Sequence, residues 1–168
     1  MRGSTLVAGI GNVFLTDDAF GVEVAHRLTG RALPEGVRVD DFGIRGIHLA
    51  YELLEGYDAL VLIDAVPMGE PPGTLAVLEP AAHRGPQSAD LAAPAVDAHT
   101  MSPDVVLATL ARLGGSVDRI FIVGCQPANL DEGMGLTPSV EAVVDEAADL
   151  CLEVLAHIPQ PVERGNHR

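Results

Sequence analysis

Asp64 is the residue of this chain that most needs a chemical explanation, because it is an acid inside an otherwise apolar run at 59–66. Burying an unpaired carboxylate costs several kcal/mol or forces its pKa upward. We therefore expect Asp64 to lie at the carboxyl end of a strand and to face a crevice. An acid that merely caps a nearby loop is the alternative, but a buried carboxylate at a strand end favours a functional role.

A pair of acids, Asp17 and Asp18, follows a second apolar run at 4–10. Two acids in the first turn of a helix stabilise its N-terminus, which explains them without any function. If the runs 4–10 and 59–66 form neighbouring strands, however, this pair and Asp64 converge on one crevice. Carboxylates that share a crevice require a proton or a cation between them.

A histidine could complete such a site, and His99 is the best placed because it lies just before Ser102, where the order Ser-Pro-Asp predicts the start of a helix. Loops before helices gather at the edge where parallel strands end. An ordinary surface-loop histidine is the alternative. Two carboxylates and one imidazole would leave coordination positions open and would suit nickel, zinc, manganese or iron. The other histidines are weaker candidates: His26, His48, His83, His157 and His167.

The segment from Gly9 to Asn12 is similar to the beginning of a dinucleotide-binding loop, but Phe14 stands where the third glycine is required. The acid that binds ribose in such folds could be Asp40 or Asp41. An acidic crevice would repel a pyrophosphate, so this pattern predicts nucleotide binding only weakly.

The elements that must position these residues alternate between strands and helices. Apolar runs predict strands at 4–10, 37–43, 59–66, 73–78 and 119–125. Apolar stripes and helix-start residues predict four helices. The first has Thr16 as its N-cap and an apolar stripe of Phe20, Val24 and Leu28, and the second, at 47–55, has Ile47, Tyr51 and Leu54 on its inward face. The third runs from Ser102 to Gly114 and the fourth from Thr137 to about Leu155.

This alternation predicts an α/β three-layer sandwich with a five-stranded, mostly parallel sheet, either flavodoxin-like or phosphorylase/hydrolase-like. The connection between 59–66 and 73–78 is too short for a parallel crossover, so we expect strand 73–78 to run antiparallel. A central strand order 2-1-3 would open a crevice at the carboxyl ends of the first and third strands. Residues 79–101 have no clear period and predict a long loop.

The composition limits the class of protein. We expect one domain at 1–158 and a frayed tail at 159–168. A formal net charge of −14 disfavours nucleic acid and anionic membranes as partners. The two cysteines, Cys125 and Cys151, form no metal-binding pair, and Cys125 is expected to be a buried structural thiol. The absence of a signal-like start and of a long apolar run predicts a cytoplasmic protein.

The segment from Gly9 to Val22, GIGNVFLTDDAFGV, resembles the N-terminal signature of the nickel–iron hydrogenase maturation proteases. The resemblance continues through Asp41-Phe42-Gly43, through Asp64 and His99, and through the segment 135–141. It covers nearly the whole domain, to about Leu155. Each piece alone is common, but their combination and order are specific.

The resemblance implies an endopeptidase that removes a short C-terminal extension from a hydrogenase large-subunit precursor after nickel insertion. The precursor's nickel, or another divalent metal in its place, would be recognised by Asp18, Asp64 and His99. The resemblance also implies a catalytic role near Asp41, and we expect a monomer. Many family members have glycine at the position of Ala19, and some have glutamate at the position of Asp18.

Two other functions remain open from the residues alone. One is a Rossmann-like nucleotide-binding module, and the other is a different metal-assisted hydrolase on the same scaffold. The chain contains no HExxH pattern and no Ser-His-Asp or Cys-His signature of a conventional protease.

Overall fold

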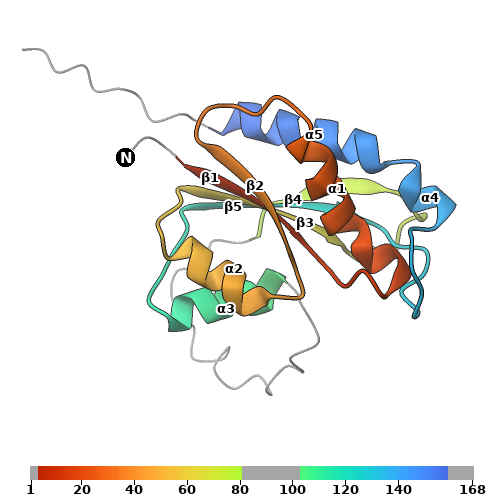
Figure 1. Ribbon diagram of the computed structural model, residues 1–168, viewed down its shortest axis with the longest axis horizontal. Helices are drawn as coiled ribbons and strands as arrows, with labels where there is room; N and C mark the ends of the chain where they lie inside the picture. The colour runs from red at the N-terminus through yellow and green to blue at the C-terminus, as the bar shows by residue number, and fades with distance from the viewer. Residues whose placement is uncertain (1–3, 81–102, 159–168) are drawn as a thin grey trace, which may run out of the picture.

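Five strands form one sheet in the order β2-β1-β3-β5-β4 (Figure 1). The computed structural model describes residues 4–80 and 103–158. The strands are β1 (Thr5–Ile10), β2 (Val37–Gly43), β3 (Ala59–Ala65), β4 (Leu75–Leu78) and β5 (Arg119–Cys125). All neighbouring pairs are parallel except β4 and β5, which are antiparallel. The predicted central order and the predicted antiparallel strand are both confirmed.

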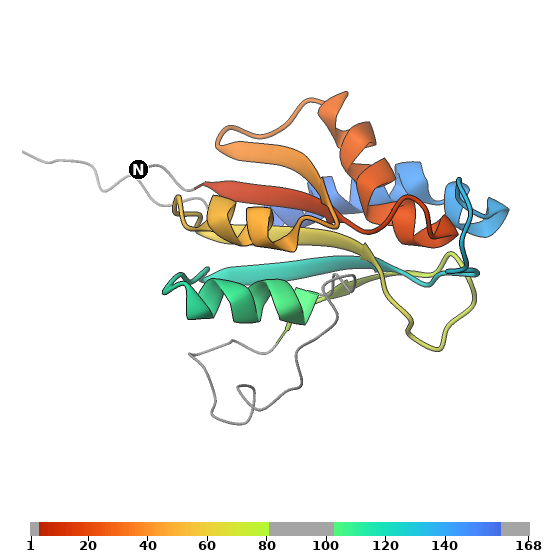
Figure 2. The same cartoon turned by 60° about the horizontal axis from the view of Figure 1, so that its bottom comes forward.

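Helices cover both faces of the sheet and complete the predicted three-layer sandwich (Figure 2). One layer contains α1 (Phe20–Thr29), α4 (Pro138–Glu141) and α5 (Val144–His157), and the other contains α2 (Gly46–Leu53) and α3 (Pro103–Arg112). A short 3-10 helix, η1 (Thr16–Ala19), leads directly into α1. None of the helices in the described ranges is both long enough and apolar enough to cross a membrane.

The two central strands are buried on both faces, and their side chains alternate between two cores. Val7 and Val61 pack toward α1 and α5, whereas Leu6 and Leu60 pack toward α2 and α3. This burial explains why β1 and β3 are continuous apolar runs, with Asp64 as the exception.

The crossovers from β1 and β3 leave toward opposite faces of the sheet. The chain after β1 forms α1 on one face, and the chain after β3 returns through β4 to α3 on the other. The last register pair between the two strands is Gly9 with Ile63. Asp64 is therefore one residue beyond the end of this pairing, at the switch point where such folds bind ligands.

The predicted cap of the first helix is wrong. Thr16 has φ 53°, and its hydroxyl donates to the Asp131 carbonyl at 2.6 Å instead of capping a helix. The helix α1 begins only at Phe20, after η1, and Ala19 at its N-cap makes no side-chain cap hydrogen bond. The loop that contains Asp131 determines this geometry, and local sequence could not reveal it.

The predicted inward face of the second helix is also wrong. Ile47 and Tyr51 are 56% and 55% exposed, and Leu54 is 41% exposed, while Leu49 and Leu53 are buried. The helix is apolar around most of its circumference, so spacing alone did not select a face.

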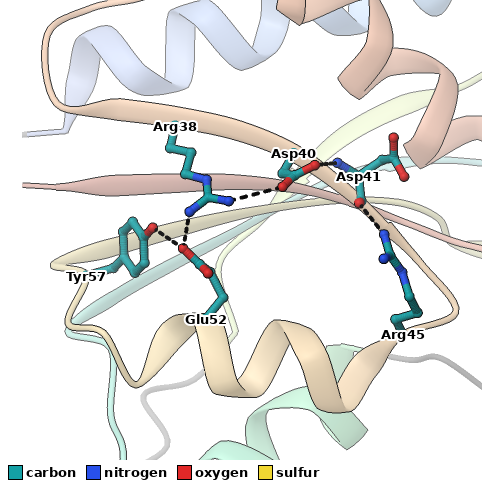
Figure 3. Close-up of polar contacts among 6 residues, drawn as sticks. All are labelled: Arg38, Asp40, Asp41, Arg45, Glu52 and Tyr57. Carbon is teal, nitrogen blue, oxygen red and sulfur yellow. Dashed lines mark hydrogen bonds and ion pairs between the residues drawn. The ribbon is translucent and has the colours of Figure 1, made fainter.

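Polar contacts join α2 to β2 in this orientation (Figure 3). Glu52 forms an ion pair with Arg38 of β2 and accepts a hydrogen bond from the Tyr57 hydroxyl at 2.6 Å. Arg38 also contacts Asp40 at 3.2 Å. With these contacts made, Leu49 and Leu53 lie in the core between α2 and the sheet.

The last predicted helix is divided in two. α4 ends at Glu141 and α5 begins at Val144. The apolar stripe along these helices is buried at Val140, Val144, Ala147, Cys151 and Leu155 and partly buried at Val143 and Val154. Most of the predicted loop 79–101, the predicted cap Ser102 and the tail from Pro159 lie outside the described residues.

Candidate active site

Asp64 is buried at the carboxyl end of β3. Its exposed fraction is 5%, and its register partner in β5 is Gly124. The carboxylate receives a hydrogen bond from the Ala65 backbone. Its other oxygen, Oδ1, has no hydrogen-bond partner among the described residues. A buried acceptor without a donor is costly and usually marks a position that a ligand or a proton completes.

Burial raises the pKa of Asp64 well above its ordinary value, and the negative charge of Asp18 raises it further. The Ala65 N–H offsets only part of this effect. Two carboxylates that interact in a poorly solvated site do not both ionise readily, so the pair favours one shared proton or a cation. The structure therefore brings Asp18 and Asp64 together as the sequence predicted.

Asp18 lies in η1 and is held by the loop that follows β1. Its Oδ2 accepts a hydrogen bond from the Asn12 backbone N–H at 2.8 Å. Burial raises the pKa of Asp18, and the Asn12 hydrogen bond lowers it in part. Gly11 has φ 136°, and a Cβ there would lie 1.8 Å from the Asp18 carbonyl oxygen. Only glycine fits between the loop and η1.

The same hydrogen bond argues against the nucleotide-binding interpretation. A phosphate-binding loop needs free backbone N–H groups at the helix start. Here the Asn12 N–H already donates to the carboxylate of Asp18. An anion at this position would meet a negative charge and a donor that is already occupied.

Asp17 has a structural role, although it directly precedes Asp18 in the chain. Its side chain is fully buried and accepts hydrogen bonds from the backbone N–H groups of Ala128 (2.8 Å), Asn129 (3.0 Å) and Thr137 (2.7 Å). The Thr137 hydroxyl also donates to it, at 2.8 Å. Burial alone would raise the pKa of Asp17, but these hydrogen bonds outweigh burial and lower it.

The residues 128–134 are a part of the site region that the sequence did not indicate. The contacts of Ala128 and Asn129 with Asp17 of η1 join positions more than 100 residues apart, so no local pattern identifies them. The sequence feature that could have indicated such contacts is the presence of two acids at 17 and 18, since one acid is enough to stabilise the N-terminus of a helix.

Asp41 is paired with His26, and its carboxylate is not hydrogen-bonded to Asp18 or Asp64. His26 Nε2 lies 2.6 Å from Asp41 Oδ2, and the His26 side chain is 57% exposed. Figure 3 shows the Asp41 carboxylate directed away from Arg38 and Arg45. The contact joins residues of α1 and β2 that are not adjacent in the chain, so the sequence did not indicate it.

His99 lies outside the described residues, so its membership of the site stays a prediction. Within residues 4–80 and 103–158, no three His, Cys, Asp or Glu side chains are grouped to hold a metal ion. The described part of the chain thus supplies two carboxylates of the predicted three-ligand set.

Cys125 is 1% exposed, as expected of a structural thiol. Burial and the negative charge of Asp17 raise the pKa of Cys125 to about 11. A thiol with this pKa is almost entirely protonated at neutral pH, so Cys125 is a poor nucleophile.

Comparison with known sequences agrees with this geometry. A family model described as hydrogenase maturation protease matches residues 22–154. The chain is 33% identical over 152 residues to the hydrogenase 2 maturation protease of Escherichia coli K12, and the match covers 89% of each chain. It is 36% identical over 144 residues to the hydrogenase expression/formation protein HupD of Rhodobacter capsulatus, covering 84% of this chain and 66% of HupD.

Solved structures give the same result. The hydrogenase maturating endopeptidase HybD of Escherichia coli superposes with a TM-score of 0.71 at 30% identity, covering 91% of this chain and 92% of HybD. A hydrogenase 2 maturation peptidase from a Thaumarchaeota archaeon superposes with a TM-score of 0.66 at 30% identity, covering 91% and 98%. The chain therefore belongs to the hydrogenase maturation protease family and is an endopeptidase of hydrogenase maturation.

Proposed function

We propose that this endopeptidase removes a C-terminal extension from a nickel-loaded hydrogenase large-subunit precursor, and that Asp18, Asp64 and His99 bind the precursor's nickel. The observation that supports this proposal best is the unpartnered, buried Oδ1 of Asp64 beside the carboxylate of Asp18. A divalent cation would supply the missing partner and remove the repulsion between the two carboxylates.

Proton release accompanies metal recognition in this proposal. Burial and Asp18 raise the pKa of Asp64, which favours a proton on this carboxyl until a cation binds. A cation displaces that proton, and its affinity for the site therefore increases with pH. Recognition fixes the adjoining scissile peptide at the crevice, where the cation can polarise the carbonyl for attack by water.

Asp41 has a positioning role in this proposal. It lies in β2 and pairs with His26 of α1, just before Gly43. The Gly43 carbonyl accepts a hydrogen bond from the Gly11 N–H at 2.9 Å. Asp41 thus supports the end of β2 against which the loop that holds Asp18 is fixed. The protein is proposed to meet the precursor as a monomer.

The test is the cleavage of purified precursor with and without nickel, followed by mass spectrometry. The wild type should release the C-terminal extension only from the nickel-loaded precursor. Asp18→Asn, Asp64→Asn and His99→Ala should each reduce the rate of cleavage by about 100-fold or more, as expected for residues that bind the metal directly. Asp118→Asn, an exposed acid before β5, is the matched control and should cleave normally. Equal cleavage of both precursor forms would refute nickel recognition, and normal activity of Asp64→Asn would refute the site.

A further inference from the structure

Phe14 and Met134 are the most exposed large apolar side chains of the described residues, at 65% and 73%. Leu130, in the same loop as Met134, is 41% exposed. Scattered apolar residues on a surface need no explanation, but a group of them on neighbouring segments often marks a binding surface. These three residues come from the two segments that meet beside η1.

The two segments are joined by backbone hydrogen bonds. Thr16 N–H donates to the Gly133 carbonyl and Gly133 N–H donates to the Phe14 carbonyl, each at 2.9 Å, which makes a short parallel bridge. Figure 2 shows these segments side by side, where the chain enters α1 and α4. The buried Asp17 fastens the same segments from inside. Phe14 and Met134 are therefore carried by a fixed backbone, so little ordering entropy is lost when they bind a partner.

The segment that carries Phe14 leads directly to the candidate active site. The Asp18 backbone N–H donates to the Leu15 carbonyl at 3.1 Å, so Phe14 is within one turn of Asp18. A polypeptide whose metal binds Asp18 and Asp64 therefore lies near the segment that carries Phe14.

The charge on this surface is negative. Asp131 and Glu132 are exposed between Leu130 and Met134. No lysine or arginine occurs at residues 3–26 or 120–163, the ranges that include both segments. An apolar surface with acidic neighbours complements a segment that has apolar side chains together with lysine or arginine.

We propose that Phe14, Leu130 and Met134, with Asp131 and Glu132, form a docking surface for the segment of the precursor that adjoins the cleavage site. This inference rests on the proposed function. The segment is extended and contains apolar side chains that cover Phe14 and Met134, with at least one lysine or arginine facing Asp131 and Glu132. The surface contributes binding and does not take part in the chemical step.

The kinetic test compares the Phe14→Ala, Met134→Ala double variant with the wild type on nickel-loaded precursor. Its KM should rise roughly tenfold or more, as expected for the loss of central apolar anchors, with kcat within about twofold. The matched control is the Ile47→Ala, Tyr51→Ala double variant, which removes similarly exposed apolar side chains from α2 and should leave KM unchanged. Thermal unfolding of all variants checks that they fold.

A second arm tests charge. Asp131→Asn with Glu132→Gln should raise KM at low salt and reduce the dependence of KM on salt concentration. If the dependence of KM on salt concentration is unchanged, the proposal that the segment carries a lysine or arginine facing Asp131 and Glu132 is wrong.

A binding arm separates this inference from the proposed function. The precursor is bound to Asp64→Asn protein with and without the Phe14 and Met134 substitutions. Weaker binding with the substitutions supports the docking surface even if the wild type does not cleave the precursor. Equal binding, or an unchanged KM in a wild type that does cleave, overturns the docking surface and leaves the proposed function intact. Sedimentation that shows a dimer broken by the same substitutions would assign the surface to self-association and overturn the inference.

Discussion

Asp17 and Asp18 are adjacent in the chain, but their carboxylates have different surroundings. Asp17 accepts hydrogen bonds from the segments at 128–129 and 137, which lower its pKa despite burial. Asp18 accepts one backbone hydrogen bond and lies beside Asp64, and burial raises its pKa. Divergent pKa values among neighbouring carboxylates separate a structural acid from acids that can exchange a proton or bind a cation.

Replacing Asp64 with asparagine should stabilise the fold while it abolishes cleavage. Because the folded-state pKa of Asp64 is raised, the wild type loses stability as pH rises from the ordinary aspartate range through the folded-state value. Asp64→Asn removes that loss, so its advantage should be about 1–2 kcal/mol at neutral pH and should disappear below about pH 4. Urea unfolding at several pH values measures this difference. A variant less stable than the wild type at pH 8 would contradict the burial argument.

Replacing Asp17 with asparagine should have the opposite effect. The amide would present an N–H group to donors that now face a carboxylate oxygen, and the variant should lose about 3 kcal/mol at neutral pH. Because the folded-state pKa of Asp17 is lowered, its contribution is present above the ordinary aspartate range and is lost as pH falls through the folded-state value. The deficit should therefore shrink in acid, as urea unfolding would show. Asp118→Asn, at an exposed acid, should leave stability unchanged within about 0.5 kcal/mol.

At the scale of elements, the position of α1 on the sheet depends on a close backbone approach. A Cβ on Gly21 would lie 2.1 Å from the Ile63 carbonyl oxygen and 2.4 Å from the Ile10 carbonyl oxygen. These oxygens belong to the ends of β1 and β3, next to Asp64. The first turn of α1 can therefore lie directly against the switch point only if residue 21 has no side chain.

Gly21→Ala should displace the start of α1 and destabilise the protein by about 3 kcal/mol or more, with loss of activity. Gly30→Ala is the matched control at the other end of the same helix, because its Cβ would meet only the Arg27 carbonyl oxygen, at 3.6 Å. Thermal unfolding of both variants distinguishes close packing from a general effect of replacing glycine. Equal stability of the two variants would show that α1 can move away from the strands at little cost.

At the scale of the whole molecule, acidic residues outnumber basic ones by 24 to 10. Repulsion among like charges destabilises the compact state. The ion pairs between α1 and α5, such as Arg27 with Asp145 at 2.6 Å, are exposed and offset little of this repulsion.

Salt should therefore stabilise the protein. Raising sodium chloride from 10 mM to 500 mM shortens the Debye length and screens the repulsion more than it weakens the exposed ion pairs. The unfolding temperature should rise by roughly 2–4 °C, the shift that ~1 kcal/mol produces in a domain of this size. Differential scanning calorimetry measures it, and a fall in unfolding temperature would show that ion pairs dominate over net charge.

The sequence by itself determined the central strand order 2-1-3, the antiparallel direction of the fourth strand and the position of Asp64. Apolar runs are local, and a short connection between the third and fourth strands permits only an antiparallel return. A charge inside such a run has few places to lie, so Asp64 could be assigned to a strand end before any coordinates were known.

Only the tertiary structure decided which of two adjacent aspartates is structural, which face of α2 is buried and what fixes Thr16. Each of these depends on contacts between residues far apart in the chain: Asp17 with Thr137, Glu52 with Arg38, and Thr16 with Asp131. The spacing of residues along the chain does not predict such partners. Hydrogen bonds and packing between distant segments select among conformations that the local sequence leaves nearly equal in energy.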